Sequence, residues 1–127
     1  MDEIFKISKS PARAEALREM ALERLADLKK EEKTYKIIEQ YYEIIKELAT
    51  AVMYLNGLKT LSHRALISYL ESNHRNSFEK EEFFLMDELR KLRNNIVYYG
   101  ERVERTFLLN KESKIKTIIE KLIKLVK

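Results

Sequence analysis

Apolar residues along this chain recur mostly at steps of three and four residues, which is the spacing of one face of an α-helix. The first run follows Ser10, whose hydroxyl can cap a helix, and Pro11, which has no N–H to satisfy at the first helical position. The run reaches Leu28 and gives way to a charged cluster, residues 29–33, with no apolar anchor. We therefore expect the first helix to begin at Pro11 and to end in this cluster.

The second run predicts the longest helix, from about Thr34 to Leu55. Its apolar seam is wide enough to contact two neighbouring helices, or one neighbour and a second subunit. Asn56-Gly57 ends it, because glycine readily adopts the left-handed conformation that follows a last helical turn. Ser62 then caps a third helix, with Leu61 and Leu66 predicted to form a hydrophobic staple around the cap.

Two more helices complete the pattern after a polar loop. Asn76 or Ser77 is predicted to cap the fourth helix, with Phe83-Phe84 in the core and a kink or break at Gly100. Asn110 is predicted to cap the fifth helix. The expected buried stripe of that helix is Ile115, Ile118, Ile119, Leu122 and Val126.

The composition favours an all-α fold. The chain has two glycines and one proline in 127 residues, and 36% of its residues are charged, so it has few turn formers and much solvated helix surface. No segment alternates apolar and polar residues over a useful strand length. We predict one domain over residues 1–127, an antiparallel up-and-down four-helix bundle with a short additional helix, five helices in all.

Several kinds of chemistry are excluded by what the sequence lacks. The absence of cysteine excludes disulfides, thiolate metal sites and cysteine nucleophiles. There is no glycine-rich phosphate loop, no Glu-x-x-His pair and no helix with two metal-binding histidines, so we expect no metal and no cofactor. No apolar run approaches the roughly 18 residues that span a bilayer, and the first residues lack the order of a signal peptide. We expect a cytoplasmic protein without a membrane partner.

The net charge of +4 is concentrated at the C-terminal end. Lys111–Lys127 contains six lysines and two glutamates, so the preceding residues are neutral in sum. The simpler interpretation is the solvated face of an amphipathic helix, which we prefer to a dedicated RNA-contact surface.

Helical spacing, basic side chains, an amide pair and two tyrosines converge in residues 88–100. In a helix, Arg93 lies between the apolar face and a polar face, so its guanidinium reaches a groove beside the buried seam. Arginine suits phosphate, asparagine can hydrogen-bond a base or ribose, and tyrosine can stack. The predicted ligand-binding residues here are Arg90, Arg93, Asn94, Tyr98 and Tyr99. A structural interpretation stays open beside this one, in which the arginines pair with Asp87, Glu88 or Glu101.

This segment resembles the signature of the HEPN family, small all-α domains in which Arg, usually followed by Asn, precedes His by four to six residues. Arg93-Asn94 match the opening of that signature, and Tyr98 stands five residues after the Arg, where His would be. The resemblance implies a fold like the substrate-binding subunits of nucleotidyltransferases. It also implies Arg93 and Tyr98 as the catalytic positions of a ribonuclease, although Tyr in place of His argues against cleavage.

The connection before the third helix supplies secondary candidates. Lys59, Ser62 and His63 bring a cation, a hydroxyl and an imidazole to one end of the bundle. Tyrosine and arginine are poor acid and base groups near neutral pH, so RNA cleavage would need strongly perturbed groups or help from His63.

Three hypotheses follow from the resemblance and the residues together. The first is a HEPN-type nucleotide- or RNA-binding domain, a homodimer with its two Arg93 motifs facing one cleft. The second is a metal-independent endoribonuclease of a toxin–antitoxin pair. The third is a non-catalytic helical partner of a separately encoded minimal nucleotidyltransferase.

Overall fold

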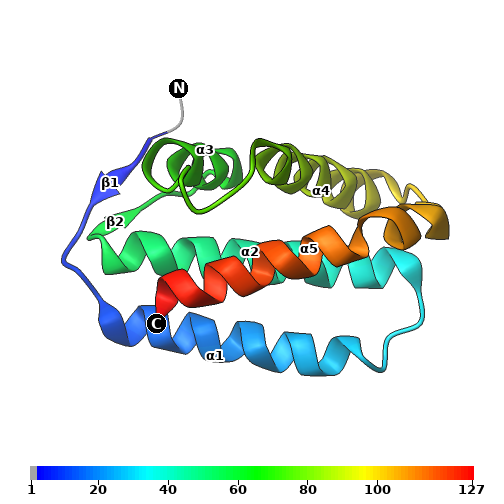
Figure 1. Ribbon diagram of the computed structural model, residues 1–127, viewed down its shortest axis with the longest axis horizontal. Coiled ribbons are helices and arrows are strands. Elements are labelled where there is room, and N and C mark those ends of the chain that lie inside the picture. The colour runs from blue at the N-terminus through cyan, green and yellow to red at the C-terminus, as the bar shows by residue number, and fades with distance from the viewer. Residues whose placement is uncertain (1–2) are drawn as a thin grey trace.

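In the computed structural model, which describes residues 3–127, the chain forms five helices and one short antiparallel sheet (Figure 1). The elements in chain order are β1 (Phe5–Lys6), α1 (Pro11–Leu28), α2 (Thr34–Leu55), β2 (Leu58–Lys59), α3 (His63–Asn73), α4 (Lys80–Tyr99) and α5 (Arg105–Val126). Within the described residues, none of the helices is both long enough and apolar enough to cross a lipid bilayer.

Helix α2 is the centre of the fold. Eleven of its 22 residues are buried, and it contacts α1, α3, α4 and α5. Of the two alternatives that the sequence left open, contact with several helices of the same chain is therefore confirmed, and contact with a second subunit stays a prediction. On the α1 side, Arg24 Nε lies 2.9 Å from Glu47 Oε1, and its Nη1 donates to Gln40 Oε1 at 3.2 Å.

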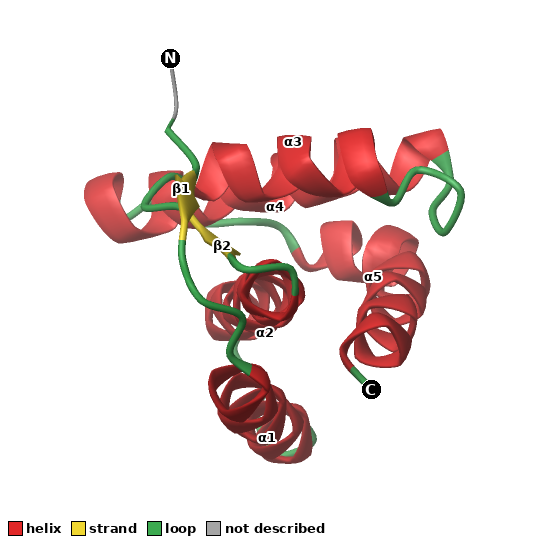
Figure 2. Cartoon of the chain, turned by 90° about the vertical axis from the view of Figure 1, so that its left-hand side faces the viewer, coloured by secondary structure: helices red, strands yellow, loops and turns green. Residues whose placement is uncertain are grey.

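The helices lie in tiers around α2. Figures 1 and 2 both show α1 on one side of α2, α3 and α4 on the other, and α5 beside α2. Helices α1 and α2 run in opposite directions and are joined by a short link (Figure 1). Helix α3 is seen nearly along its axis in Figure 1 and from its side in Figure 2, so it crosses the direction of α1, α2 and α5.

The first two helices have the predicted bounds. Ser10 Oγ accepts a hydrogen bond from Arg13 N at 3.3 Å, and Pro11 is the first residue of α1. After α2, Gly57 adopts a φ of 71°, and its carbonyl oxygen accepts from Ile7 N at 2.9 Å. This contact continues the pairing of β1 with β2, which the sequence did not predict because each strand is only two residues long.

The start of α3 agrees with the prediction in part. Ser62 is the N-cap, and its Oγ accepts from Ala65 N at 3.1 Å. The predicted staple is wrong, because Leu61 is 83% exposed while Leu66 is buried.

The predicted start of α4 is also wrong. Glu79 caps the helix in place of Asn76 or Ser77, and its backbone N–H donates to Glu82 Oε1 at 2.6 Å. The two glutamates form a reciprocal capping box, which satisfies N–H groups that the helix leaves unpaired.

Further corrections concern the end of α4 and the start of α5. Gly100 ends α4 with a φ of 64°, so it is a break. Helix α5 begins at Arg105, and Asn110 is an interior residue of it, since Leu108 already packs in the core. The predicted stripe of α5 is buried throughout. Phe83 is buried as predicted, whereas Phe84 is 67% exposed and was wrongly assigned to the core.

Candidate functional site

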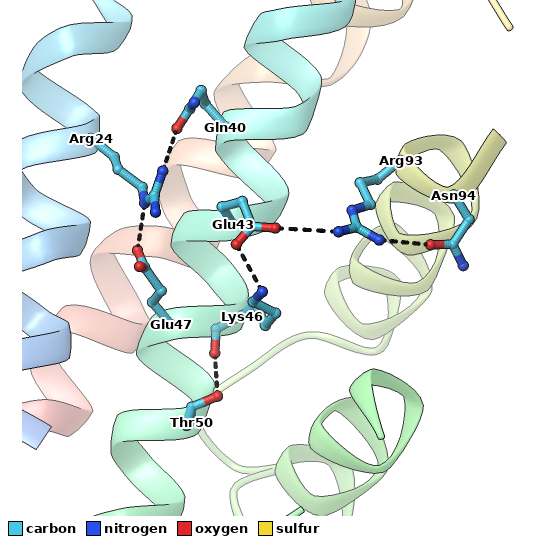
Figure 3. A network of polar contacts seen from close by, with 8 residues as sticks. All are labelled: Arg24, Gln40, Glu43, Lys46, Glu47, Thr50, Arg93 and Asn94. Carbon is cyan, nitrogen blue, oxygen red and sulfur yellow. Dashed lines mark hydrogen bonds and ion pairs between the residues drawn. The ribbon is translucent and has the colours of Figure 1, made fainter. Parts of the chain in front are cut away.

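Three helices bring polar side chains together around Arg93. Arg93 and Asn94 come from α4, Glu43 and Lys46 from α2, and His63 from the first turn of α3. Figure 3 shows Arg93 facing Glu43 across the space between α4 and α2. The Arg93 side chain is 19% exposed, which agrees with the predicted position beside the buried seam.

The guanidinium of Arg93 has three neighbours. Its Nη1 donates to Asn94 Oδ1 at 3.2 Å, its Nη2 lies 3.6 Å from Glu43 Oε1, and its Cζ is 5.8 Å from the centroid of the Tyr42 ring. Glu43 is held more closely by Lys46, whose Nζ is 2.8 Å from Glu43 Oε2. One carboxylate therefore lies between two cations, and this half-buried group retains one positive charge.

Arg90 pairs with Asp87, as the structural interpretation of the sequence proposed. Its Nε donates to Asp87 Oδ1 at 2.8 Å, and Lys91 Nζ lies 3.3 Å from the other oxygen of the same carboxylate. Burial acts to raise the pKa of Asp87, but the hydrogen bonds and charges of Arg90 and Lys91 outweigh it and hold this pKa below its ordinary value. Arg93 does not pair as that interpretation proposed, because its carboxylate partner Glu43 belongs to another helix.

His63 lies beside the same tyrosine ring as Arg93. The ring centroids of His63 and Tyr42 are 5.7 Å apart, with the planes tilted by 47°. Burial lowers the pKa of His63, and the positive charges of Lys46 and Arg93 lower it further. The imidazole is therefore neutral at pH 7 and able to accept a proton.

Tyr42, Glu43 and Lys46 were not identified as site residues from the sequence. Tyr42 is buried, and that burial raises the pKa of its hydroxyl. Glu43 and Lys46 form an ordinary i,i+3 pair on the helix. No local signal in the sequence relates this pair to Arg93, fifty positions further along the chain.

The other predicted site residues do not converge on Arg93. Tyr98 and Tyr99 are 67% and 80% exposed at the end of α4. A step of five residues turns a helix by about 140°, so Arg93 and Tyr98 point to different sides of α4. Lys59 is half-buried in β2, where it is paired with Phe5.

Cavities near these residues lie to one side of Arg93. A cavity of about 220 Å³ between α3 and α4 is lined by Arg64, Ile67, Ser68, Glu71, Lys80, Phe83, Phe84 and Asp87. It reaches the Arg90 pair through Asp87 and does not include Arg93. Residues 3–127 contain no cluster of three or more His, Asp or Glu side chains that could hold a metal ion.

Comparisons with known proteins gave no match. No protein-family model matches the sequence, and neither a curated protein nor a solved structure resembles the chain significantly. A function for this chain therefore has to be inferred from its own residues.

Proposed function

We propose that this chain is a HEPN-type nucleotide- or RNA-binding domain. In this proposal it forms a homodimer and belongs to a two-component, toxin–antitoxin-like system with a separately encoded minimal nucleotidyltransferase. Its α1, α2, α4 and α5 would be the four helices of an antiparallel up-and-down bundle, with α3 as the short additional helix, as in nucleotidyltransferase substrate-binding subunits. The antiparallel directions of α1 and α2 in Figure 1 support that topology in part, whereas α4 lies with α3 across α1, α2 and α5 in Figure 2.

The observation that carries the proposal is the incomplete neutralisation of Arg93. Its 3.6 Å separation from Glu43 is longer than a direct hydrogen bond, and Lys46 binds the same carboxylate at 2.8 Å. An incoming phosphate would meet a planar guanidinium fork and a second cation in a partly desolvated position, where charge-assisted hydrogen bonds are strong. Asn94 Oδ1 already accepts from Arg93, which leaves its amide N–H groups available to a base or ribose.

Substitution of Arg93 tests the proposal. Hydrogen bonds to charged groups contribute about 1.5–3 kcal/mol, so Arg93→Ala should weaken binding of RNA or a mononucleotide about 10- to 150-fold. Arg75→Ala, which removes the same charge from an exposed loop residue, is the matched control and should bind as the unchanged chain does. Affinity would be measured by fluorescence anisotropy, and helicity by circular dichroism. Equal affinities for both variants would remove the proposal.

The partnership has a separate test. A tagged copy of this chain, expressed from its native genomic neighbourhood, should co-purify with a small nucleotidyltransferase encoded beside it. Recovery of the tagged chain without such a protein would argue against the two-component system and leave nucleotide binding intact.

A second function, metal-independent RNA cleavage, is favoured by the position of His63. The neutral imidazole can take the proton of a 2′-hydroxyl while that oxygen attacks phosphorus. The bond from phosphorus to the 5′ oxygen then breaks, and the same proton passes from His63 to the leaving oxygen. Arg93, which lies beside the same Tyr42 ring as His63, would stabilise the charge that develops on the phosphoryl oxygens.

The cleavage test is RNA degradation in the presence of EDTA. Cleavage that disappears in both His63→Gln and Arg93→Ala would support this second function. If Tyr98→Phe also abolishes it, the hydroxyl at the position of the family His takes part. RNA that stays intact with the unsubstituted protein would limit the chain to binding.

A further inference from the structure

The outer face of α4 carries exposed aromatic and basic side chains in a row. At 3.6 residues per turn, steps of three and four residues keep positions within about 40° of one direction. The residues that share this face are Lys80, Phe84, Asp87, Lys91, Asn94 and Tyr98. Phe84 and Tyr98 are each 67% exposed, although aromatic side chains of this size are usually buried.

Phe84 lies at the rim of a cavity that two cations share. The space of about 220 Å³ between α3 and α4 is bounded by Phe84 and Lys80 from α4 and by Arg64 and Ser68 from α3. Phe83, which is buried and lies 5.5 Å from the ring of Phe78, also lines it. The ring of Phe84 is thus held on a rigid helix with one side open to a ligand.

Cations and carboxylates are both numerous around this face. The cations are Arg64, Lys80, Arg90, Lys91 and Arg93, and the carboxylates that line the same cavity or pair with these cations are Glu43, Glu71 and Asp87. Glu81 and Glu88, three residues before and four residues after Phe84 on α4, are exposed on the side of the helix next to Phe84 and raise the number of carboxylates to five, so that only Lys46 is in excess. Arg64 and Lys80, which line the cavity with Phe84, form no ion pair within the described residues. Unpaired cations beside an exposed aromatic ring are elements with which proteins bind single-stranded nucleic acid.

We propose that Phe84, with Arg64 and Lys80, is a second nucleotide subsite, so that the chain binds a single strand of several nucleotides along α4. The inference rests on the proposed nucleotide- or RNA-binding function. One base stacks on the Phe84 ring, and its phosphate is bound by Arg64 and Lys80. The strand then passes Lys91 and reaches Asn94, about 15 Å further along the helix axis. Arg93 donates to the Asn94 side chain from the neighbouring face of α4. A duplex is excluded from this subsite because its base faces are already stacked.

The test compares three probes by fluorescence anisotropy or competition: a labelled ten-nucleotide oligouridylate, an RNA hairpin duplex, and the monophosphate of ribose, ribose 5-phosphate. Phe84→Leu keeps the apolar volume and removes the π-face, so it should weaken oligouridylate binding about 5- to 150-fold. Binding of the ribose monophosphate, which has no base to stack, should not change. Phe84→Tyr should restore oligouridylate binding, and Leu109→Ala, which alters an equally exposed apolar residue on α5, should have no effect.

The salt dependence of binding tests whether Lys80 contacts a phosphate. Each single-strand phosphate contact contributes about 0.7 to the slope of the logarithm of affinity against the logarithm of salt concentration. Lys80→Gln should reduce that slope by about this amount, whereas Lys114→Gln on α5 should leave it unchanged.

The outcomes separate the subsite from the function on which it rests. If Arg93→Ala weakens binding of every probe and Phe84→Leu weakens none, the subsite is refuted and nucleotide binding stands. If every variant, Arg93→Ala included, binds oligouridylate and the monophosphate as tightly as the unsubstituted chain does, the subsite and nucleotide binding are both refuted. A Phe84→Ser variant that changes the oligomeric state in light scattering, with unchanged RNA affinity, would identify the ring as a protein contact and overturn the inference.

Discussion

Glu82 fastens the start of α4, the helix that carries the candidate site, to α5. Its Oε1 accepts from the backbone N–H of Glu79 at 2.6 Å and from Lys121 Nζ at 2.6 Å. Glu82 is only 7% exposed, and Lys121 also lies over the ring of Phe78, 5.9 Å from its centroid. We predict that Glu82→Ala destabilises the fold and loosens the position of α4.

The expected magnitude follows from the two contacts. Loss of a helix-capping interaction costs about 1 kcal/mol, and loss of a hydrogen bond to a charged group costs about 1.5 kcal/mol. The Lys121 side chain is 30% exposed, so its ammonium can turn to water when Glu82 is removed, and the larger penalty of a stranded buried charge does not apply. Glu82→Ala should therefore lower the free energy of unfolding by about 2.5 kcal/mol, a large part of the roughly 5–15 kcal/mol of a typical domain.

Urea unfolding followed by circular dichroism measures this loss. Glu82→Gln keeps an acceptor for the Glu79 N–H and removes the charge, so it should cost about half as much as Glu82→Ala. A double-mutant cycle with Lys121→Met should give a coupling free energy of about 1 kcal/mol between the two side chains. A Glu82→Ala variant within about 0.5 kcal/mol of the unsubstituted protein, or a cycle with no coupling, would refute this account of how α4 is anchored.

Two further predictions concern the backbone and the pH dependence of stability. Gly57→Ala and Gly100→Ala each place alanine at positive φ, which costs about 1–2 kcal/mol. The Gly57 variant should be the less stable of the two in urea. Its added Cβ would lie 2.9 Å from the Ile7 carbonyl oxygen, whereas nothing lies within 4 Å of the Cβ added at Gly100. Equal losses would show that the backbone at Ile7 moves away from the added Cβ at no cost in free energy. Because the pKa of His63 is below 6.5 in the folded chain, the unfolded chain binds a proton that the folded one does not as pH falls below 6.5. The free energy of unfolding should therefore decrease from pH 7 to pH 5, and His63→Gln should remove this decrease; parallel pH profiles for the two proteins would contradict the burial of the imidazole beside Tyr42.

Local signals in the sequence were sufficient for the first two helices. Ser10 and Pro11 determine the start of α1 through one side-chain hydrogen bond and one missing donor, and Asn56-Gly57 ends α2 by a backbone conformation. These effects act within one helical turn, so they can be read without knowledge of the neighbours.

Packing between helices overrode other local signals. Asn110 is a good cap by type, yet α5 begins at Arg105 because Leu108 is buried against the core and continues the helix toward its N-terminus. Phe84 and Phe83 are adjacent and equally apolar, yet only Phe83 is buried. Burial of one aromatic and exposure of the next depend on where α3 packs against α4.

Some features of the candidate site follow from the sequence, and others depend on the fold. Helical periodicity alone placed Arg93 at the edge of the buried seam, and the structure agrees. Its pairing with Glu43, the sharing of that carboxylate with Lys46, and the approach of His63 to Tyr42 all join helices that are distant in the sequence. Periodicity tells which side of each helix is apolar, but the partner that each side meets depends on how the helices cross, and only the folded chain specifies that.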